Sequence, residues 1–158
     1  MSSSTMRVAE YLRGCGVGTG VVHLDKTTRT AELAAQAIGC PVGAIVKSLV
    51  FLADGRPVLV LASGDRRVST EKLGRLVGAE QVTIARASEV KEITGFAIGG
   101  VPPVAHDNID MVLMDEHLRR FEMVYAAAGS PFDIFPVTPF DLERIAGARV
   151  CDVVEDVS

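Results

Sequence analysis

The chain has little of what metal centres and disulfide frameworks are built from. Only three of its 158 residues are cysteine and three are histidine. Cys15, Cys40 and Cys151 are widely spaced and odd in number, so we expect reduced, mostly buried thiols. The histidines never stand at i and i+4, and neither C-x-x-C nor H-x-E occurs, which argues against metal catalysis.

Other absences exclude further classes of protein. No apolar run reaches the roughly 18 residues that cross a bilayer, and Met1 to Arg7 lacks the apolar core of a signal peptide. We therefore expect a cytoplasmic protein that does not enter a membrane. The motifs G-x-S-x-G and G-x-x-x-x-G-K-S/T are also missing, so neither a serine triad nor a P-loop is indicated.

Positive charge is not plainly concentrated in the sequence. The formal net charge is −4, and a general duplex-DNA binder usually carries a basic face, so we expect no DNA binding. Small basic clusters do occur at 26–29, at 65–67 and at 119–120. Such residues either contact phosphates on one rim or form a solvated surface, and the sequence leaves both interpretations open.

Hydrophobic residues make up 48% of the chain, which supports one mixed α/β domain over residues 1–158, with 1–20 as a helical lead-in. Helices are predicted over 4–15, 31–38, 70–77, 89–94 and 139–146, with Ser88 capping the fourth. Strands are predicted over 21–24, 43–52, 57–62, 81–85, 111–114, 132–137 and 149–154. Residues 18–20 are expected to turn, and residues 121–128 fit either a helix or a strand. This irregular order disfavours a doubly wound Rossmann sheet.

The strand predicted over 43–52 carries one charge in its middle, Lys47. Because side chains alternate along a strand, Lys47 shares a face with Ile45, Leu49 and Phe51. A lysine among large apolar side chains must reach water, find a partner or line a cavity. It is either an edge-strand lysine that discourages aggregation or a fixed cation that stabilises an oxyanion or anchors a carbonyl or phosphate. It could act as a base only if burial lowered its pKa greatly.

A second unusual stretch, 96–107, contains the run Gly99-Gly100-Val101-Pro102-Pro103. Glycine permits positive φ and close backbone approach, whereas proline fixes φ and removes a donor. Such a loop is sharp and rigid, and it suits the presentation of backbone amides to a ligand. A purely structural connection would use the same residues.

Five segments together resemble the YbaK/EbsC family, which includes the editing domain of bacterial prolyl-tRNA synthetases and its free-standing relatives. The segments are Thr30–Ala34, Ile45–Phe51, Ser63–Arg67, Gly99–Pro103 and Ala128–Ser130. They occur in order within a stretch from about Val21 to Asp152. The strand lysine and the G-x-x-x-P loop form the specific pair.

The resemblance implies a mixed α/β fold with helices around a partly closed sheet, and neither metal nor organic cofactor. It implies trans-editing, the hydrolysis of the ester between a wrong amino acid and the 3′-terminal adenosine of tRNA. Lys47 matches the family's essential lysine, which orients the substrate. The amides of Gly100 and Val101 match the loop near the scissile carbonyl, where they would stabilise an oxyanion while water or a substrate thiol attacks. The other expected substrate-binding residues are Thr30, Ser48, Gly99, Pro102, Pro103, His106, Gly129 and Ser130.

Two departures from the family pattern leave the edited amino acid open. Ser48 stands where other branches carry Asn or Thr, and Val104-Ala105 precedes His106 where Phe-Gly is frequent. Cysteinyl-, alanyl-, seryl- and threonyl-tRNA are all candidate substrates. An aminoacyl-tRNA synthetase is a further candidate partner, and both a monomer and a homodimer stay open. The alternatives are a non-catalytic module that binds tRNA ends or a protein, and a hydrolase of small acyl esters. His106 either lines the pocket or tethers the loop by a hydrogen bond.

Overall fold

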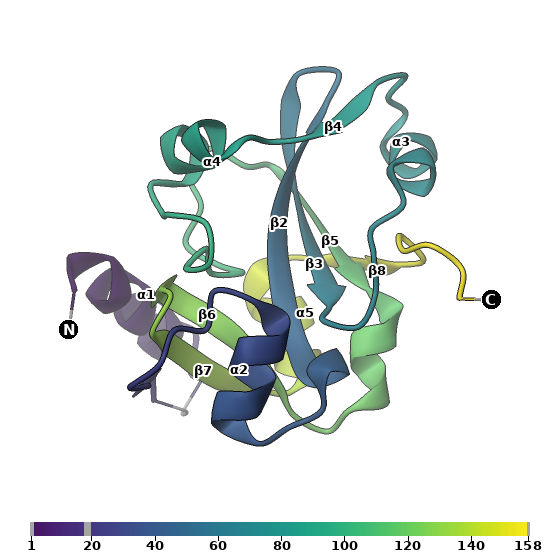
Figure 1. Cartoon of the computed structure of the whole chain (residues 1–158). Coiled ribbons are helices and arrows are strands. Elements are labelled where there is room, and N and C mark those ends of the chain that lie inside the picture. Colours follow the sequence, from purple (N-terminus) through teal and green to yellow (C-terminus); the bar gives the residue numbers. More distant parts are fainter. Residues whose placement is uncertain (1, 18–19, 158) are drawn as a thin grey trace.

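Helices and strands of the computed structural model form a mixed α/β fold, as the sequence predicts (Figure 1). The structure describes residues 2–17 and 20–157, so Gly18 and Thr19 of the predicted turn lie outside the described residues. The helices are α1 (Ser3–Gly14), α2 (Ala31–Ile38), α3 (Thr70–Val77), α4 (Ala87–Thr94) and α5 (Pro139–Ala146). The strands are β1 (Val22–His23), β2 (Ile45–Ala53), β3 (Arg56–Ser63), β4 (Val82–Ile84), β5 (Met111–Asp115), β6 (Val124–Ser130), β7 (Asp133–Val137) and β8 (Arg149–Cys151). Two short 3₁₀ helices, η1 (Val42–Ala44) and η2 (Glu116–Arg120), precede β2 and follow β5.

The eight described strands belong to one sheet in the order β1-β7-β6-β2-β3-β5-β8, with β4 also paired to β2. β2 and β3 form an antiparallel hairpin, and its turn residues Asp54 and Gly55 both have positive φ, as a tight two-residue turn requires. β2 pairs with β6 in parallel, and β3 pairs with β5 in parallel. The predicted mixed sheet is therefore confirmed, with β2 and β3 at its centre.

Capping chemistry explains why two helices have the predicted bounds. Thr30 and Ser69 each accept a hydrogen bond from the backbone of the first turn that follows, which begins α2 and α3. Gly39 and Gly78 end the same helices in the left-handed conformation, which glycine adopts without a Cβ clash. Both boundaries therefore follow from single residues that the sequence displays.

Three predicted boundaries are wrong by two residues or more, and one open choice is settled. Residues 43–44, predicted to begin the central strand, belong to η1, so β2 begins at Ile45. The cap of α4 is Arg86 and not Ser88, because the Glu89 carboxylate accepts the Arg86 N–H at 2.9 Å and starts the helix earlier. The last predicted strand ends at Cys151, and Val154 forms only an isolated bridge. Most of the ambiguous segment 121–128 is strand, because it pairs with β7 as the antiparallel partner of a hairpin.

The core lies on both faces of the central hairpin. Val46 and Val50 of β2 pack into the largest cluster of buried side chains, beneath α1 and the loop that follows α4. On the other face Ile45 packs against the alanines Ala31 and Ala34 of α2. Of the helices described, none has the length and apolar character needed to cross a membrane.

Candidate functional site

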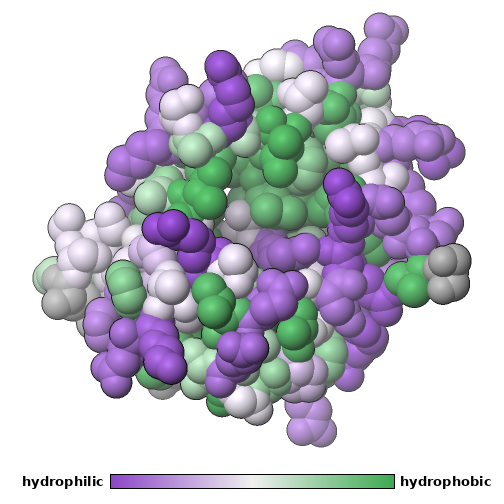
Figure 2. Space-filling view, viewed as in Figure 1, coloured by the Kyte–Doolittle hydropathy of each residue, from purple (hydrophilic) through white to green (hydrophobic). Residues whose placement is uncertain are grey.

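A cavity of about 340 Å³ lies beside β2, between α2 and the loop that follows α4. Its volume falls in the range of about 300–1,000 Å³ that is usual for small-ligand sites. The lining comes from the start of α2, the first half of β2, the β4–α4 connection, the middle of β6 and three residues of the loop after α4, namely Ile98, Gly99 and Val101. Figure 2 shows the hollow next to β2, surrounded mostly by hydrophobic side chains with hydrophilic residues at its rim.

The cavity occupies a gap in the strand pairing of β2. On this edge β2 pairs with β6 only at Ile45 and Val46, and with β4 only from Phe51 to Ala53. The N–H of Ala85 donates to the carbonyl of Val50 at 3.0 Å, so the even-numbered residues of β2 direct their main-chain groups to this edge. The N–H and C=O of Ser48 therefore lie at an open strand edge, where a bound ligand can take the place of a strand.

Lys47 stands on the wall of this cavity and is half-buried. Its Nζ donates to the main-chain carbonyl of Arg66 at 2.6 Å, which fixes the ammonium in place. Burial lowers the Lys47 pKa, while the negative charges of Glu32, Asp65 and Asp115 act in the opposite direction and favour the ammonium. The interpretation of Lys47 as a plain edge-strand residue does not describe this geometry.

The turn that supplies the Arg66 carbonyl is itself held firmly. Asp65 accepts hydrogen bonds from both terminal nitrogens of Arg120, at 2.8 and 3.2 Å, and from Ser63 Oγ at 3.0 Å. The Arg120 guanidinium is the main cause that lowers the Asp65 pKa. Gly64 is required at the bend, because a Cβ there would collide with the carbonyl of Val42. The segment 63–67 thus serves as the support of Lys47.

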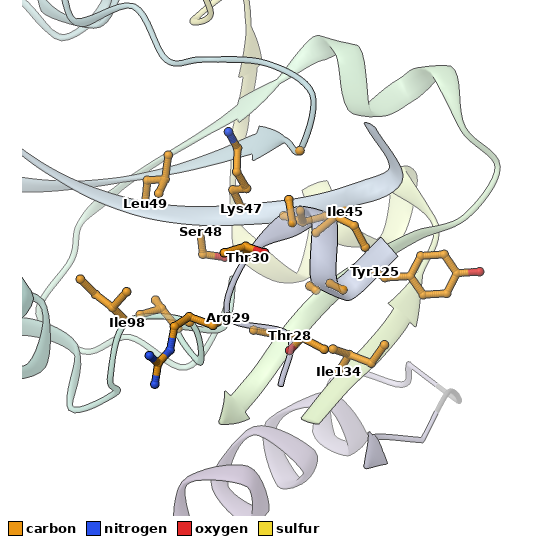
Figure 3. A pocket seen from close by; sticks show the side chains of 18 of the residues that line it. Thr28, Arg29, Thr30, Ile45, Lys47, Ser48, Leu49, Ile98, Tyr125 and Ile134 are labelled. Atoms are coloured by element: carbon orange, nitrogen blue, oxygen red, sulfur yellow. The ribbon is translucent and has the colours of Figure 1, made fainter. Parts of the chain in front are cut away.

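Ser48 and Thr30 also line the cavity, as expected. Figure 3 shows Lys47 and Leu49 on one side of β2 and Ser48 on the other, so the cavity wraps around the strand edge. Ser48 Oγ is buried and has no hydrogen-bond partner among the described residues. Thr30 Oγ1 accepts the N–H of Leu33 at 3.2 Å, so it caps α2 as well. Ser48 thus brings one unused hydroxyl and one unused peptide group to the same place.

The glycine-proline loop reaches the cavity with only part of its length. Gly99 and Val101 line it, whereas Gly100, Pro102 and Pro103 are buried behind it. The Gly100 N–H donates to the Ala97 carbonyl at 3.0 Å and so is already engaged. The N–H of Val101 has no acceptor among the residues described here.

The remaining expected site residues lie outside the cavity lining, and two of the three bond to the loop. His106 Nε2 donates to the Pro102 carbonyl at 2.7 Å, and burial lowers the His106 pKa, which keeps the ring neutral. The Gly129 N–H donates to the Gly100 carbonyl at 3.0 Å. Ser130 Oγ donates to the buried carboxylate of Asp133. In this structure, His106 therefore tethers the loop.

Sequence reasoning did not single out several residues of the cavity. Ile98 and Tyr125 carry no local signal that sets them apart from core residues, and both line the cavity. Arg29 was visible only as part of a basic cluster, yet it stands at the mouth beside Gly99. Within residues 2–17 and 20–157, no three His, Cys, Asp or Glu side chains gather as a metal site.

Comparison with known proteins gives a consistent result. Residues 25–145 match the family model of the aminoacyl-tRNA editing domain. YwhH of Bacillus subtilis (strain 168) is 34% identical over 140 residues, which cover 86% of this chain and 87% of the relative. A proline–tRNA ligase of Lactobacillus helveticus is 39% identical over 100 residues, or 63% of this chain, but the match spans only 18% of the ligase.

A solved structure agrees along the whole chain. The crystal structure of a proposed trans-editing enzyme for prolyl tRNA synthetase superposes with a TM-score of 0.91 and 45% sequence identity. The superposition covers 99% of each chain. The likeness therefore includes the helices and loops that enclose the cavity as well as the central sheet.

Proposed function

The chain belongs to the aminoacyl-tRNA editing domain family, and from this premise we propose that it hydrolyses the ester bond of mischarged aminoacyl-tRNA. The observation that carries the proposal is the Lys47 ammonium, held at the wall of a cavity by the Arg66 carbonyl. Beside it, the peptide group of Ser48 lies at an open strand edge. A fixed cation and unused peptide donors are what an ester needs for orientation and polarisation.

The proposed roles follow from which groups are available. Lys47 orients the 3′ end of the substrate as a cation, and the N–H groups of Val101 and Ser48 stabilise the tetrahedral oxyanion. Gly100 contributes by its close packing, because its own N–H is bonded to Ala97. The aminoacyl ester is already activated, so water or a substrate thiol attacks without a protein nucleophile, and we propose a step that needs no metal or cofactor.

The candidate substrates are cysteinyl-, alanyl-, seryl- and threonyl-tRNA. The Ser48 hydroxyl and the small side chains of Ala31 and Ala34 line the cavity, so size and one hydroxyl contact would select among these amino acids. We further propose that residues 1–158 act as one editing domain in the cytoplasm, as a monomer or homodimer. The partners would be the 3′ end of tRNA and the synthetase that mischarges it.

Deacylation of a panel of mischarged tRNAs tests the proposal. The panel holds Cys-, Ala-, Ser- and Thr-tRNA, and wild type is compared with Lys47→Ala and with buffer alone. Lys91→Ala is the matched control, because Lys91 is exposed and outside the cavity lining. We expect one ester to be cleaved by wild type and by Lys91→Ala, and not by Lys47→Ala.

Two results would contradict this function. If wild type cleaves no ester faster than buffer alone but still binds tRNA, the chain is a non-catalytic module that binds tRNA ends. If aminoacyl-adenosine and intact aminoacyl-tRNA are cleaved at equal rates, the chain is a small-ester hydrolase that ignores the rest of tRNA.

A further inference from the structure

Arg29 is a charged side chain at the cavity that no ion pair or side-chain hydrogen bond to a described residue explains. Most arginines of the described chain bind a carboxylate or a carbonyl. Among residues 2–17 and 20–157, four arginine side chains have no such partner: Arg13, Arg29, Arg56 and Arg149. Of these four, only Arg29 lines the cavity beside β2. An unpaired guanidinium at the edge of a ligand site is available to a ligand.

The position of Arg29 is fixed by its neighbours. The preceding residue, Thr28, is buried and bonded twice to the Pro131 carbonyl, through its N–H at 2.5 Å and its Oγ1 at 2.7 Å. The following residue, Thr30, caps α2. The stem of Arg29 lies against Gly99, where a Cβ would come within 3.3 Å of Arg29 Cα and Cγ. Because both neighbouring residues are held in place, the backbone of Arg29 has a defined position at the mouth of the cavity.

The two cations of the cavity lie apart and differ in their surroundings. Figure 3 shows the Lys47 amine and the Arg29 guanidinium on opposite sides of β2, with Arg29 near Ile98. The Lys47 ammonium already donates to the Arg66 carbonyl and is attracted by the charges of three nearby carboxylates. Arg29 has no ion pair with any described carboxylate. Arg29 is therefore the cation that remains free for an anion of the ligand.

We propose that Arg29 binds the phosphodiester that joins the terminal adenosine to the rest of the tRNA. This inference rests on the proposed function, because an aminoacyl ester in the cavity has that phosphate as its nearest anion. A guanidinium binds two phosphate oxygens through two parallel N–H donors, which fixes orientation as well as adding affinity. Arg29 is thus a positioning residue: it sets where the ester lies relative to Lys47 and contributes to preference for tRNA over small esters.

The test compares two substrates that differ only in this phosphate. They are aminoacyl-adenosine and aminoacyl-adenosine 5′-monophosphate, each carrying the amino acid that the panel identifies. The variants are Arg29→Ala, Arg29→Lys and Arg149→Ala, the last as a control because Arg149 is exposed, unpaired and outside the cavity lining. We expect Arg29→Ala to lower kcat/KM about tenfold for the phosphate-bearing substrate and to leave the other unchanged. Arg29→Lys should restore part of the loss.

A binding measurement makes the inference independent of catalysis. A fluorescent RNA hairpin with an uncharged single-stranded ACCA end is titrated with each variant at several salt concentrations. Arg29→Ala should bind about tenfold more weakly, with a salt dependence of log K reduced by about 0.7, the value for one phosphate contact on a single strand. If wild type cleaves no ester but this difference is found, the proposed hydrolysis fails and the phosphate contact stands.

Three outcomes overturn the inference. Equal losses on both adenosine substrates would mean that Arg29 only supports Gly99. An effect of Arg149→Ala as large as that of Arg29→Ala would mean general charge attraction. Unchanged affinity of Arg29→Ala for the RNA hairpin would mean that no phosphate contacts Arg29.

Discussion

Gly100 tests the physical basis of the loop at the cavity. A Cβ at this residue would lie 2.7 Å from Ser130 Cα and 2.9 Å from both the backbone N and C of Ser130. These are backbone atoms of β6 that cannot rotate away as a side chain would. The methyl group of Gly100→Ala must therefore displace the loop away from β6. Overpacking of this kind costs about 1–3 kcal/mol, and loss of the bond between the Gly129 N–H and the Gly100 carbonyl adds about 1 kcal/mol. We therefore expect a loss of about 2–4 kcal/mol.

Urea unfolding and thermal melting measure this loss. For a chain of this size, each 1 kcal/mol shifts Tm by about 2–4 °C, so Tm should fall by about 4–16 °C. The control is Gly14→Ala, because a Cβ at Gly14 meets no atom within 4 Å and its φ is not positive. Editing activity at low temperature should fall for Gly100→Ala and not for Gly14→Ala. Equal stability of the two variants would refute the close approach of the loop to Ser130.

Three further predictions concern the surroundings of the cavity. Burial lowers the Lys47 pKa, so if the ammonium is the working form, ester cleavage above the buffer rate should decline at a pH below the ordinary lysine value of 10.5. Asp65→Asn removes the carboxylate that Arg120 holds and should cost less than about 1 kcal/mol at neutral pH, because the pair is partly exposed. Because the Asp65 pKa is lower in the folded than in the unfolded state, the carboxylate stabilises the fold at pH values above its unfolded pKa. The stability difference between wild type and Asp65→Asn should therefore vanish as the pH falls through the folded pKa. Arg7→Ala removes a 2.6 Å bond to the Ala105 carbonyl and should speed amide hydrogen exchange in 104–108.

Each of these has a result that would count against it. A pH–rate profile that stays level beyond pH 10.5 would mean that the Lys47 charge is not needed. A stability difference for Asp65→Asn that does not shrink as the pH is lowered from 5 to 2 would show that the ion pair is not its cause. For Arg7, the matched variant is Arg13→Ala on the same helix, because the Arg13 guanidinium has no partner among the described residues. Equal exchange rates in both variants would contradict a contact of Arg7 that holds the loop against α1.

Most of the secondary structure followed from local signals in the sequence. Thr30, Ser69, Gly39 and Gly78 are caps whose effect is local, so the helices between them were predicted to the residue. The cap of α4 was missed because Glu89, a residue inside the helix, does the capping, and Ser88 looked like the better candidate. The segment around Val124–Ser130 stayed ambiguous because only pairing with β7, a tertiary contact, makes it a strand.

The site was predictable where a residue is out of place in its own element. Lys47 stood out because a charge in an apolar strand requires an explanation, and the cavity supplies one. The open edge at Ser48 could not be predicted, because it depends on where β6 and β4 stop pairing with β2. The role of Arg29 could not be predicted either, since the local sequence does not distinguish an unpaired surface arginine from one that lines a cavity. Resemblance placed His106 among the pocket residues, and only the fold shows it bonded to Pro102 behind the cavity.

The most direct test separates chemistry from binding in one variant. Single-turnover cleavage of the ester that the panel identifies, and the Kd for the same tRNA uncharged, are measured for wild type and Lys47→Ala. Loss of a fixed electrostatic group at the reacting centre costs about 10²–10³ in rate. We expect a fall of that size in the cleavage rate with Kd changed by no more than about threefold. An unchanged cleavage rate with a weakened Kd would contradict the central claim and make Lys47 a binding residue only.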